Sequence, residues 1–309
     1  MVYHVTSLGD DANTFGTLRH GLEQHALGQP ITIVFDVDGY ITLNSKLGIT
    51  RDNVTIAGQT APGEGIALTG DQMSVGADNV IIRHVRFRPG KSAGRVDSLS
   101  ISSGQNVIFD HISAGFSWDE NASANGLTQH GIKNLTLQNS SVSYGLEDHS
   151  AGSLIQNSDD LSYHHTLYAH NHSLNPKARV EEGGIEWIGN VVYDYNNGFI
   201  AGDSATTEFF WKASVYGNTY ITGPGDTGRP IVKDGQVQNY GLYFGTNAYD
   251  NDGDTIHDPT DYTGNGVDST GLAGVVSGTY TWSATPFGDT KIWLEDTTQA
   301  AYLRTLDNF

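Results

Sequence analysis

The chain has 309 residues, a formal net charge of −19 and no cysteine, which excludes disulfides, thiolate metal sites and a thiol nucleophile. Its length is sufficient for a sizeable core, its 37% hydrophobic content argues against disorder, and no apolar run approaches the roughly 18 residues of a membrane-spanning helix. We therefore expect a soluble globular protein with no membrane partner, and with no nucleic-acid partner because an acidic surface repels phosphate backbones.

The N-terminal segment predicts a short helix. Residues 14–25 carry apolar side chains at helical spacing. Such a helix would cap the open N-terminal end of an apolar core and protect it from edge pairing. Residues 1–4 contain neither a basic stretch nor the start of an apolar one, so no signal peptide is predicted here.

A repeat dominates the region from residue 53 to about residue 220. Each unit begins with a turn-forming Asn or Asp, continues as a short alternating β-prone segment, and starts 26, 27, 28 and 26 positions after the previous one. The first residues of the units are Asn53, Asn79, Asn106, Asn134 and Asp160. Because the leucine spacing of leucine-rich repeats is absent, this period predicts a parallel β-helix with one coil per unit.

A second polar position recurs five residues after the start of the last four of these units. It is occupied by His84, His111, Asn139 and His165. Stacked coils would align these side chains into a ladder, so we expect them to pack structurally and not to bind a metal.

The C-terminal region is less regular. Beyond about residue 245 the sequence is rich in Asp, Gly and Thr, and residues 294–306 predict a final short helix. Residues 250–261 place acids at ligand positions of a calcium loop, but Thr255 stands where a glycine is required, so a solvated acidic loop is favoured over a structural calcium site. No linker is evident, and we expect one domain, 1–309, with regular coils over about 30–245 and an irregular region over 246–309.

Several motifs, in order along the chain, resemble those of bacterial pectate lyases of polysaccharide lyase family 1. They comprise residues 49–66, 79–88, 109–113, 142–145 and 167–177. The resemblance covers roughly residues 30–220. It implies an all-β protein, a single-stranded right-handed parallel β-helix that cleaves acidic polysaccharides by calcium-assisted β-elimination, usually outside the cell.

The resemblance also implies a Ca²⁺ site. The positions that match the family's calcium-binding carboxylates are Asp97 and Asp119, and Glu120 is an additional candidate ligand. Calcium prefers several hard oxygen ligands, and the ion would offset the repulsion between an acidic protein and a polyuronate. The alternative is that Asp119 and Glu120 are solvated turn carboxylates. His149 and Trp118 are expected to contact the substrate.

Two positions depart from the family pattern. Ala151 stands where the family has a substrate-binding Lys, and Leu174 stands where it has the catalytic Arg. Lys177 and Arg179 retain the later cations of the same motif and would lie on one face of a strand. A Lys with a lowered pKa can act as a base and an Arg can stabilise developing negative charge, so this pair is the leading catalytic hypothesis. The alternative is that both cations only pair with nearby carboxylates.

The sequence thus favours a monomeric, secreted lyase acting on a polysaccharide that contains uronic acid, and two alternatives stay open. A glycoside hydrolase could use paired carboxylates on the same scaffold. The candidate pairs are Glu147 with Asp148, Glu181 with Glu182, and Asp119 with Glu120. A non-catalytic carbohydrate-binding module could instead stack sugars on aromatic side chains. The candidates are Trp118, Trp187, Trp211, Tyr144 and Tyr168, although aromatic residues at coil-periodic positions are more often part of the core.

Overall fold

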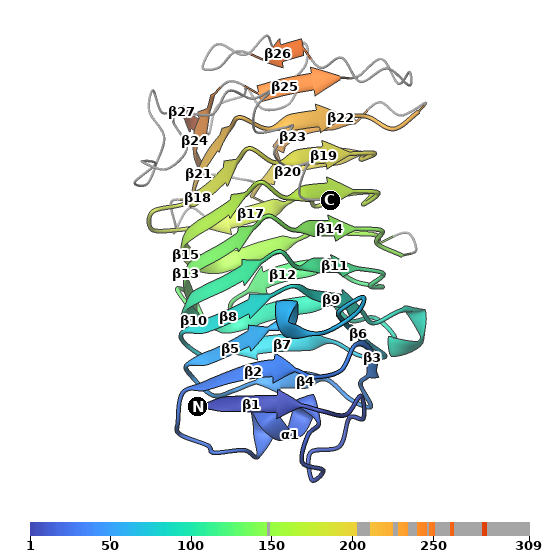
Figure 1. Cartoon of the computed structure of the whole chain (residues 1–309). Helices are drawn as coiled ribbons and strands as arrows, with labels where there is room; N and C mark the ends of the chain where they lie inside the picture. Colours follow the sequence, from blue (N-terminus) through green and yellow to red (C-terminus); the bar gives the residue numbers. More distant parts are fainter. Residues whose placement is uncertain are drawn as a thin grey trace.

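The structure is a computed structural model that describes residues 1–146, 149–202, 211–224, 228–233, 240–245, 247–250, 260–262 and 280–282. Coil after coil stacks along one axis, with parallel strands in register (Figure 1). The predicted parallel β-helix is confirmed. The predicted helix at 294–306 and most of the acidic loop at 250–261 lie outside the described residues.

One sheet has ten strands and receives one strand from each successive coil. Pairing is parallel from β3 to β25, and only the last pair, β25 with β26, is antiparallel. Its strands are β3 (Gly39–Thr42), β6 (Ile66–Thr69), β9 (Val85–Arg88), β11 (Ser113–Gly115), β14 (Ser141–Ser143), β16 (Leu167–Ala169), β19 (Val191–Tyr193), β22 (Thr219–Ile221), β25 (Asn247–Asp250) and β26 (Thr260–Tyr262).

The other sheet has 17 strands arranged as two columns, which are joined because β10 and β15 each run through both. Parallel pairing begins with β1 against β2 and extends to β27 against β24. The strands are β1 (Val2–Val5), β2 (Ile31–Phe35), β4 (Leu47–Ile49), β5 (Val54–Ala57), β7 (Met73–Gly76), β8 (Val80–Arg83), β10 (Leu99–Asp110), β12 (Ala122–Asn125), β13 (Ile132–Gln138), β15 (Leu154–His164), β17 (Lys177–Val180), β18 (Ile185–Ile188), β20 (Asn197–Ala201), β21 (Trp211–Tyr216), β23 (Arg229–Lys233), β24 (Tyr240–Phe244) and β27 (Tyr280–Trp282).

The core consists of apolar columns that run along the axis. Successive coils are in register, so an apolar residue at the same point of each repeat lies directly above the previous one. One such column, buried throughout, contains Val54, Val80, Val107, Leu135, Leu161 and Ile185. The hydrophobic effect, which scales with the apolar area removed from water, therefore holds each coil onto the next.

The residues that begin the repeats form a ladder of hydrogen bonds. Asn79 Nδ2 donates to Asn53 Oδ1 at 3.1 Å, and Asn106 and Asn134 continue the series at 3.0 and 3.1 Å. All four residues have positive φ between 53° and 61°. Asn tolerates this left-handed conformation better than most residues, which explains why it marks each turn.

The second polar series also stacks, as the sequence predicts. The rings of His84 and His111 lie 4.7 Å apart and nearly parallel. Asn139 Nδ2 continues the series by donating to Oδ1 of the buried Asp110, at 3.2 Å. Burial by itself would raise the pKa of Asp110, but hydrogen bonds from Asn139, Gln138, Arg83 and His111 outweigh it and lower the pKa to about 2.

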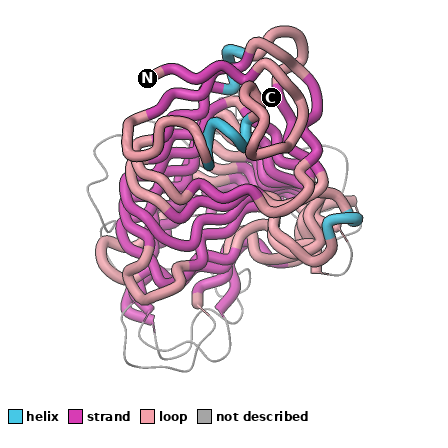
Figure 2. The backbone as a smooth tube through the Cα atoms, turned by 90° about the horizontal axis from the view of Figure 1, so that it is seen from below, coloured by secondary structure: helices cyan, strands magenta, loops and turns pink. Residues whose placement is uncertain are grey.

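A short helix, α1 (Leu18–Glu23), lies across the N-terminal end of the coil (Figure 2). Its buried residues include Leu18 and Leu22, so the predicted capping helix is confirmed, although it is shorter than residues 14–25. Thr17 is extended and accepts a hydrogen bond from His20 N at 3.1 Å, which starts the helix at Leu18. Two further short helices among the described residues, both 3₁₀, are η1 (Gly58–Thr60) and η2 (Lys91–Ala93). In the described part of the chain, no helix is long and apolar enough to cross a membrane.

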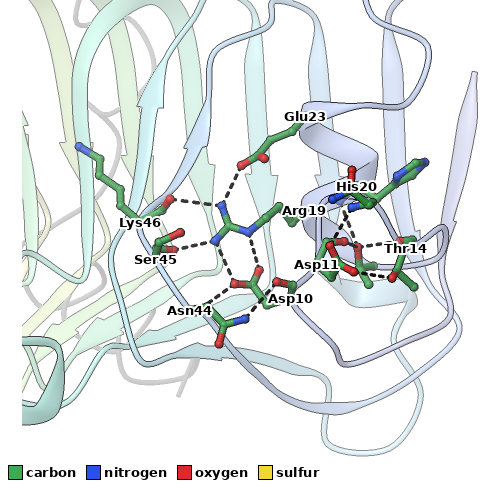
Figure 3. A network of polar contacts seen from close by, with 11 residues as sticks. Asp10, Asp11, Thr14, Arg19, His20, Glu23, Asn44, Ser45 and Lys46 are labelled. Atoms are coloured by element: carbon green, nitrogen blue, oxygen red, sulfur yellow. Dashed lines mark hydrogen bonds and ion pairs between the residues drawn. The ribbon is translucent and has the colours of Figure 1, made fainter.

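Arg19 fastens this cap to the first coils (Figure 3). Its guanidinium contacts Asp10 at 2.8 and 3.0 Å and Glu23 at 2.8 Å. It also donates to the carbonyl oxygen of Ser45 at 2.7 Å. Because Arg19 and Asp10 are almost fully buried, the ion pair links the helix, the preceding turn and the segment after β3.

The hydrogen bonds of the Asn ladder are expected to stabilise the fold. Asn106→Ala removes two side-chain hydrogen bonds and places Ala at a φ of 57°, so the free energy of unfolding should fall by about 2 kcal/mol. Urea unfolding followed by circular dichroism measures the change. Asn106→Gly tolerates the positive φ, so its free energy of unfolding should fall by less than that of Asn106→Ala. Equal stability of Asn106→Ala and the parent chain would contradict a stabilising role for the ladder.

The lowered pKa of Asp110 implies that the stability of the fold depends on pH. Because folding lowers its pKa, ionised Asp110 contributes stability above the unfolded pKa of about 4, and this contribution is lost as the pH falls towards 2. Asp110→Asn should therefore be less stable than the parent chain by about 2 kcal/mol at pH 7, with the gap narrowing below pH 4. Urea midpoints between pH 7 and pH 2.5 test this, and a gap that stays constant would contradict it.

Candidate active site

Three carboxylates and one imidazole from three successive coils meet where the chain enters the strands of the larger sheet. Asp97 precedes β10, Asp119 and Glu120 precede β12, and His149 precedes β15. A backbone hydrogen bond aligns two of the segments that precede these strands, because Ser98 N donates to Glu120 O at 3.1 Å. The structure thus brings together four of the residues singled out from the sequence.

His149 lies between two of the carboxylates. Its Nε2 is 2.9 Å from Asp119 Oδ1 and 3.4 Å from Glu120 Oε1. The candidate ligand atoms of these three residues all lie within 4.8 Å of one another. Asp97 joins the group by accepting a hydrogen bond from Glu120 N at 3.2 Å, and the exposed Arg95 reaches Asp119 Oδ1 at 3.4 Å.

The cluster holds more negative charge than its protein partners neutralise. Burial, followed by the charges of Glu120 and Asp119, raises the pKa of Asp97 to about 8. Burial and then Asp119 also raise the pKa of Glu120, although His149 opposes the shift. A divalent cation would relieve this repulsion, and several carboxylate oxygens are the donor set that calcium prefers. The residues present therefore fit Ca²⁺.

Of the two positions that depart from the family pattern, Ala151 adjoins the cluster and Leu174 lies one coil beyond Ala151. Ala151 pairs with Glu120 on one side and with Ser173 on the other, and it is fully buried. A side chain longer than that of Ala would therefore lie next to the carboxylates at this position. Leu174 follows Ser173 and has a φ of 55°, and its carbonyl oxygen accepts a hydrogen bond from Ser153 N at 2.7 Å.

Lys177 and Arg179 are partly exposed on the outer face of β17, whereas Ala178 between them is buried in the core. Lys177 pairs with Leu154 of the preceding coil. Leu154 lies three residues after Ala151, so Lys177 is three strand positions beyond Ala151 and one coil further along the axis. Strand geometry puts its backbone about 10 Å along the strand and about 10 Å along the axis from that of Glu120.

Arg179 lies further from the carboxylates than Lys177 does. It is in register with Gln156, and its guanidinium lies 5.9 Å from the centre of the Trp211 ring. Lys177 is therefore the cation of this pair that is nearer to the cluster.

The aromatic side chains considered for sugar stacking divide into two groups. Trp187, Trp211 and Tyr168 are buried in the core. Trp118 is partly exposed, and Lys91 Nζ lies 5.3 Å from the centre of its ring. Tyr144 is 50% exposed on the outer surface.

Sequence reasoning missed His172. It lies one coil beyond Ser150, whose Oγ accepts a hydrogen bond from His172 N at 3.3 Å. Its Nε2 is 3.2 Å from Asn196 Nδ2, and it helps to line a hollow of about 280 Å³. The sequence contained a hint, because His172 lies two residues before Leu174, in the motif that the resemblance had already singled out. The sequence alone did not show that His172 lies one coil beyond Ser150, the residue that follows His149. A second hollow, of about 410 Å³, lies beside η1 and His111, away from the carboxylates.

These features define a class of protein, a parallel β-helix with a cluster of carboxylates at the edge of its larger sheet. The chain is 37% identical over 279 residues to a protein of Aspergillus flavus named probable pectate lyase C, a match that covers 89% of the chain and 61% of the relative. A second relative of the same name, from Neosartorya fischeri, is 36% identical over 293 residues, which is 93% of the chain and 64% of that protein. The chain is similar to these proteins and spans about six tenths of their length.

Solved structures show the same fold. The major allergen from cedar pollen, jun a 1, matches with a TM-score of 0.67 at 15% identity, covering 99% of this chain and 87% of the allergen. A pectate lyase from a Bacillus species in complex with trigalacturonate matches with a TM-score of 0.63 at 14% identity, covering 93% and 87%. No family model matches the chain.

Proposed function

We propose that the chain is a polysaccharide lyase that cleaves a polymer containing uronic acid by calcium-assisted β-elimination. The observation that carries the proposal is the convergence of Asp97, Asp119 and Glu120 in a chain so similar to proteins named probable pectate lyase C. Because the proposed substrate is a large acidic polymer, the proposal includes that the protein acts outside the cell. It also includes that the protein acts as a monomer.

The three carboxylates would hold the calcium ion. When bound, the ion would neutralise the substrate carboxylate and increase the acidity of the adjacent C–H bond. His149 contacts Asp119 and Glu120 in the structure, so it is positioned to contact a sugar at the same place. Partly exposed Trp118 lies beside this cluster in sequence and would provide an apolar surface for a sugar ring.

Lys177 is the proposed base. In its neutral form Nζ would take the proton from the carbon next to the substrate carboxylate, and the released electron pair would form a C=C bond. The glycosidic C–O bond breaks with its electron pair on the leaving oxygen, which takes a proton from water. A sugar polymer on the outer face would pass both the carboxylates and Lys177, which is consistent with their separation of two coils. Arg179, further along the same strand, would bind negative charge on a neighbouring sugar.

The arrangement of Asp119 and Glu120 favours elimination over hydrolysis. In glycosidases the two carboxyl groups flank the scissile bond, about 5–5.5 Å apart for retention or 6.5–9.5 Å apart for inversion. Asp119 and Glu120 instead both contact one imidazole and do not face each other across an open gap. Of the other candidate pairs, Glu181 is buried while Glu182 is exposed, and Glu147 with Asp148 lies outside the described residues.

The reaction class can be tested through product mass. Incubation with polygalacturonate, alginate and neutral glycans in the presence of calcium should release unsaturated oligosaccharides, each one water lighter than a hydrolysis product. Mass spectrometry and absorbance of the new double bond detect them, and chelator should abolish them. Fully hydrated products would instead establish hydrolysis, and binding without any product would establish a carbohydrate-binding module.

Lys177→Ala tests the proposed base. It should lower kcat by at least about 100-fold with little change in calcium affinity, because only proton transfer is lost. Lys133→Ala is a matched control, since Lys133 is also on the outer surface and lies 3.8 Å from Asp160. Unchanged turnover in Lys177→Ala would remove this residue from the mechanism and direct attention to His172.

Asp119→Asn and Glu120→Gln test the calcium ligands. Each change removes one negative charge with little change in shape, so calcium affinity should fall about tenfold or more. Isothermal titration with calcium alone measures the loss, and activity should be partly restored by high calcium concentrations. If both variants bind calcium as tightly as the parent chain, the ion is held elsewhere.

A further inference from the structure

A second group of potential metal ligands lies at the opposite end of the strands from the candidate active site. His130 precedes β13, Asp159 lies in β15, and Glu181 follows β17, so the three residues belong to successive coils. Their candidate ligand atoms lie within 4.8 Å of one another. Neither the pectate lyase resemblance nor the proposed mechanism uses any of them.

Glu181 is the most informative member of the group. The residue is only 6% exposed, and its Oε2 is buried with no hydrogen-bond partner. Leaving a carboxylate oxygen buried and unpaired carries a large desolvation cost. Among the described residues, the charged groups that act on Glu181 are the carboxylate of Asp159 and the imidazole of His130, and the Trp211 side chain also hydrogen-bonds to it. A ligand with positive charge would satisfy this oxygen.

The other two residues are held in place by the backbone of the same coils. Asp159 is 2% exposed, and its Oδ1 accepts a hydrogen bond from Glu182 N at 3.0 Å. His130 Nδ1 lies 3.0 and 2.8 Å from the two oxygens of Asp159. Glu181 N donates to Ser158 O at 3.0 Å, which fixes the position of Glu181 beside Asp159.

His130 reaches the group because of the turn that carries it. In this coil Leu99 pairs with Ala122, yet Gly104 pairs with Ile132, so extra residues are accommodated between Asn125 and Ile132. His130 lies in this longer turn with a φ of 56°, and its side chain is 45% exposed. One side of the group is therefore open to solvent.

We propose that His130, Asp159 and Glu181 bind a divalent transition-metal cation of the zinc class, which links three successive coils. One imidazole nitrogen and two carboxylate oxygens are a ligand set that suits zinc, and water would occupy the open side at His130. Calcium prefers ligand sets made only of oxygen, so this site differs in selectivity from the carboxylates at Asp97 and Glu120. The cation replaces the proton shared by His130 and Asp159 and pairs with the unsatisfied oxygen of Glu181.

The test uses zinc chloride and the full chain after treatment with chelator and dialysis. Because His149 and its carboxylates could also take up zinc, the titrations are done in the Asp119→Asn background. Bound zinc is measured by mass spectrometry of the metal after gel filtration, and the thermal unfolding midpoint is followed as zinc is added. We expect one zinc per chain and a midpoint that rises with zinc, since a ligand that binds only the folded state stabilises it.

His130→Ala and Glu181→Gln should each weaken zinc binding at least about tenfold and abolish the rise in midpoint. Glu182→Gln is the matched control, because this neighbouring carboxylate is exposed and should leave zinc binding unchanged. His130 is exposed and Glu181→Gln preserves shape, so far-ultraviolet circular dichroism of both variants without zinc should match that of the parent. The proposal is overturned if the Asp119→Asn chain takes up no zinc, or if both variants bind it as tightly as the control. Neither readout depends on lyase activity.

Discussion

The structure depends on one constraint, the in-register stacking of parallel coils. Each coil supplies the next with backbone partners and with side chains at the same position, so a property repeated once per coil becomes a continuous column. Apolar residues in register form the core, and Asn residues in register form a ladder on its surface. The same constraint produces polar sites, because side chains that are more than 20 residues apart in sequence meet when their coils stack.

Stacking also explains why negative charges accumulate at two places, which are the two proposed cation sites. Asp97 and Glu120 are neighbours along the axis, so their carboxylates repel each other in a partly buried place. At the other end of the strands, Asp159 and Glu181 meet in the same way, with His130 as the charged partner. In both places the register of the coils brings the acids close together. The ligand sets differ, and this difference gives each group its own preference for a metal.

Much of this could be predicted from the sequence. The spacing of Asn53, Asn79 and Asn106 gives the length of the coil. The family resemblance points to Asp97 and Asp119, and Glu120 is adjacent to Asp119. The sequence predicted that His149 contacts the substrate, but not that it contacts Asp119 and Glu120. That contact depends on how His149 aligns with the preceding coil, which the sequence alone does not show. The burial of Glu181 and the distance of Arg179 from the cluster were beyond prediction, since both depend on which strand position faces which neighbour.

The longer turn between Asn125 and Ile132 shows how this architecture tolerates changes in length. The extra residues lie wholly between two paired segments, and the strands on both sides keep their partners. An insertion in such a protein therefore lengthens one loop and leaves the neighbouring coils in register. Loops beside the carboxylate cluster can change in size independently of the scaffold, so a new substrate preference can evolve without a new core.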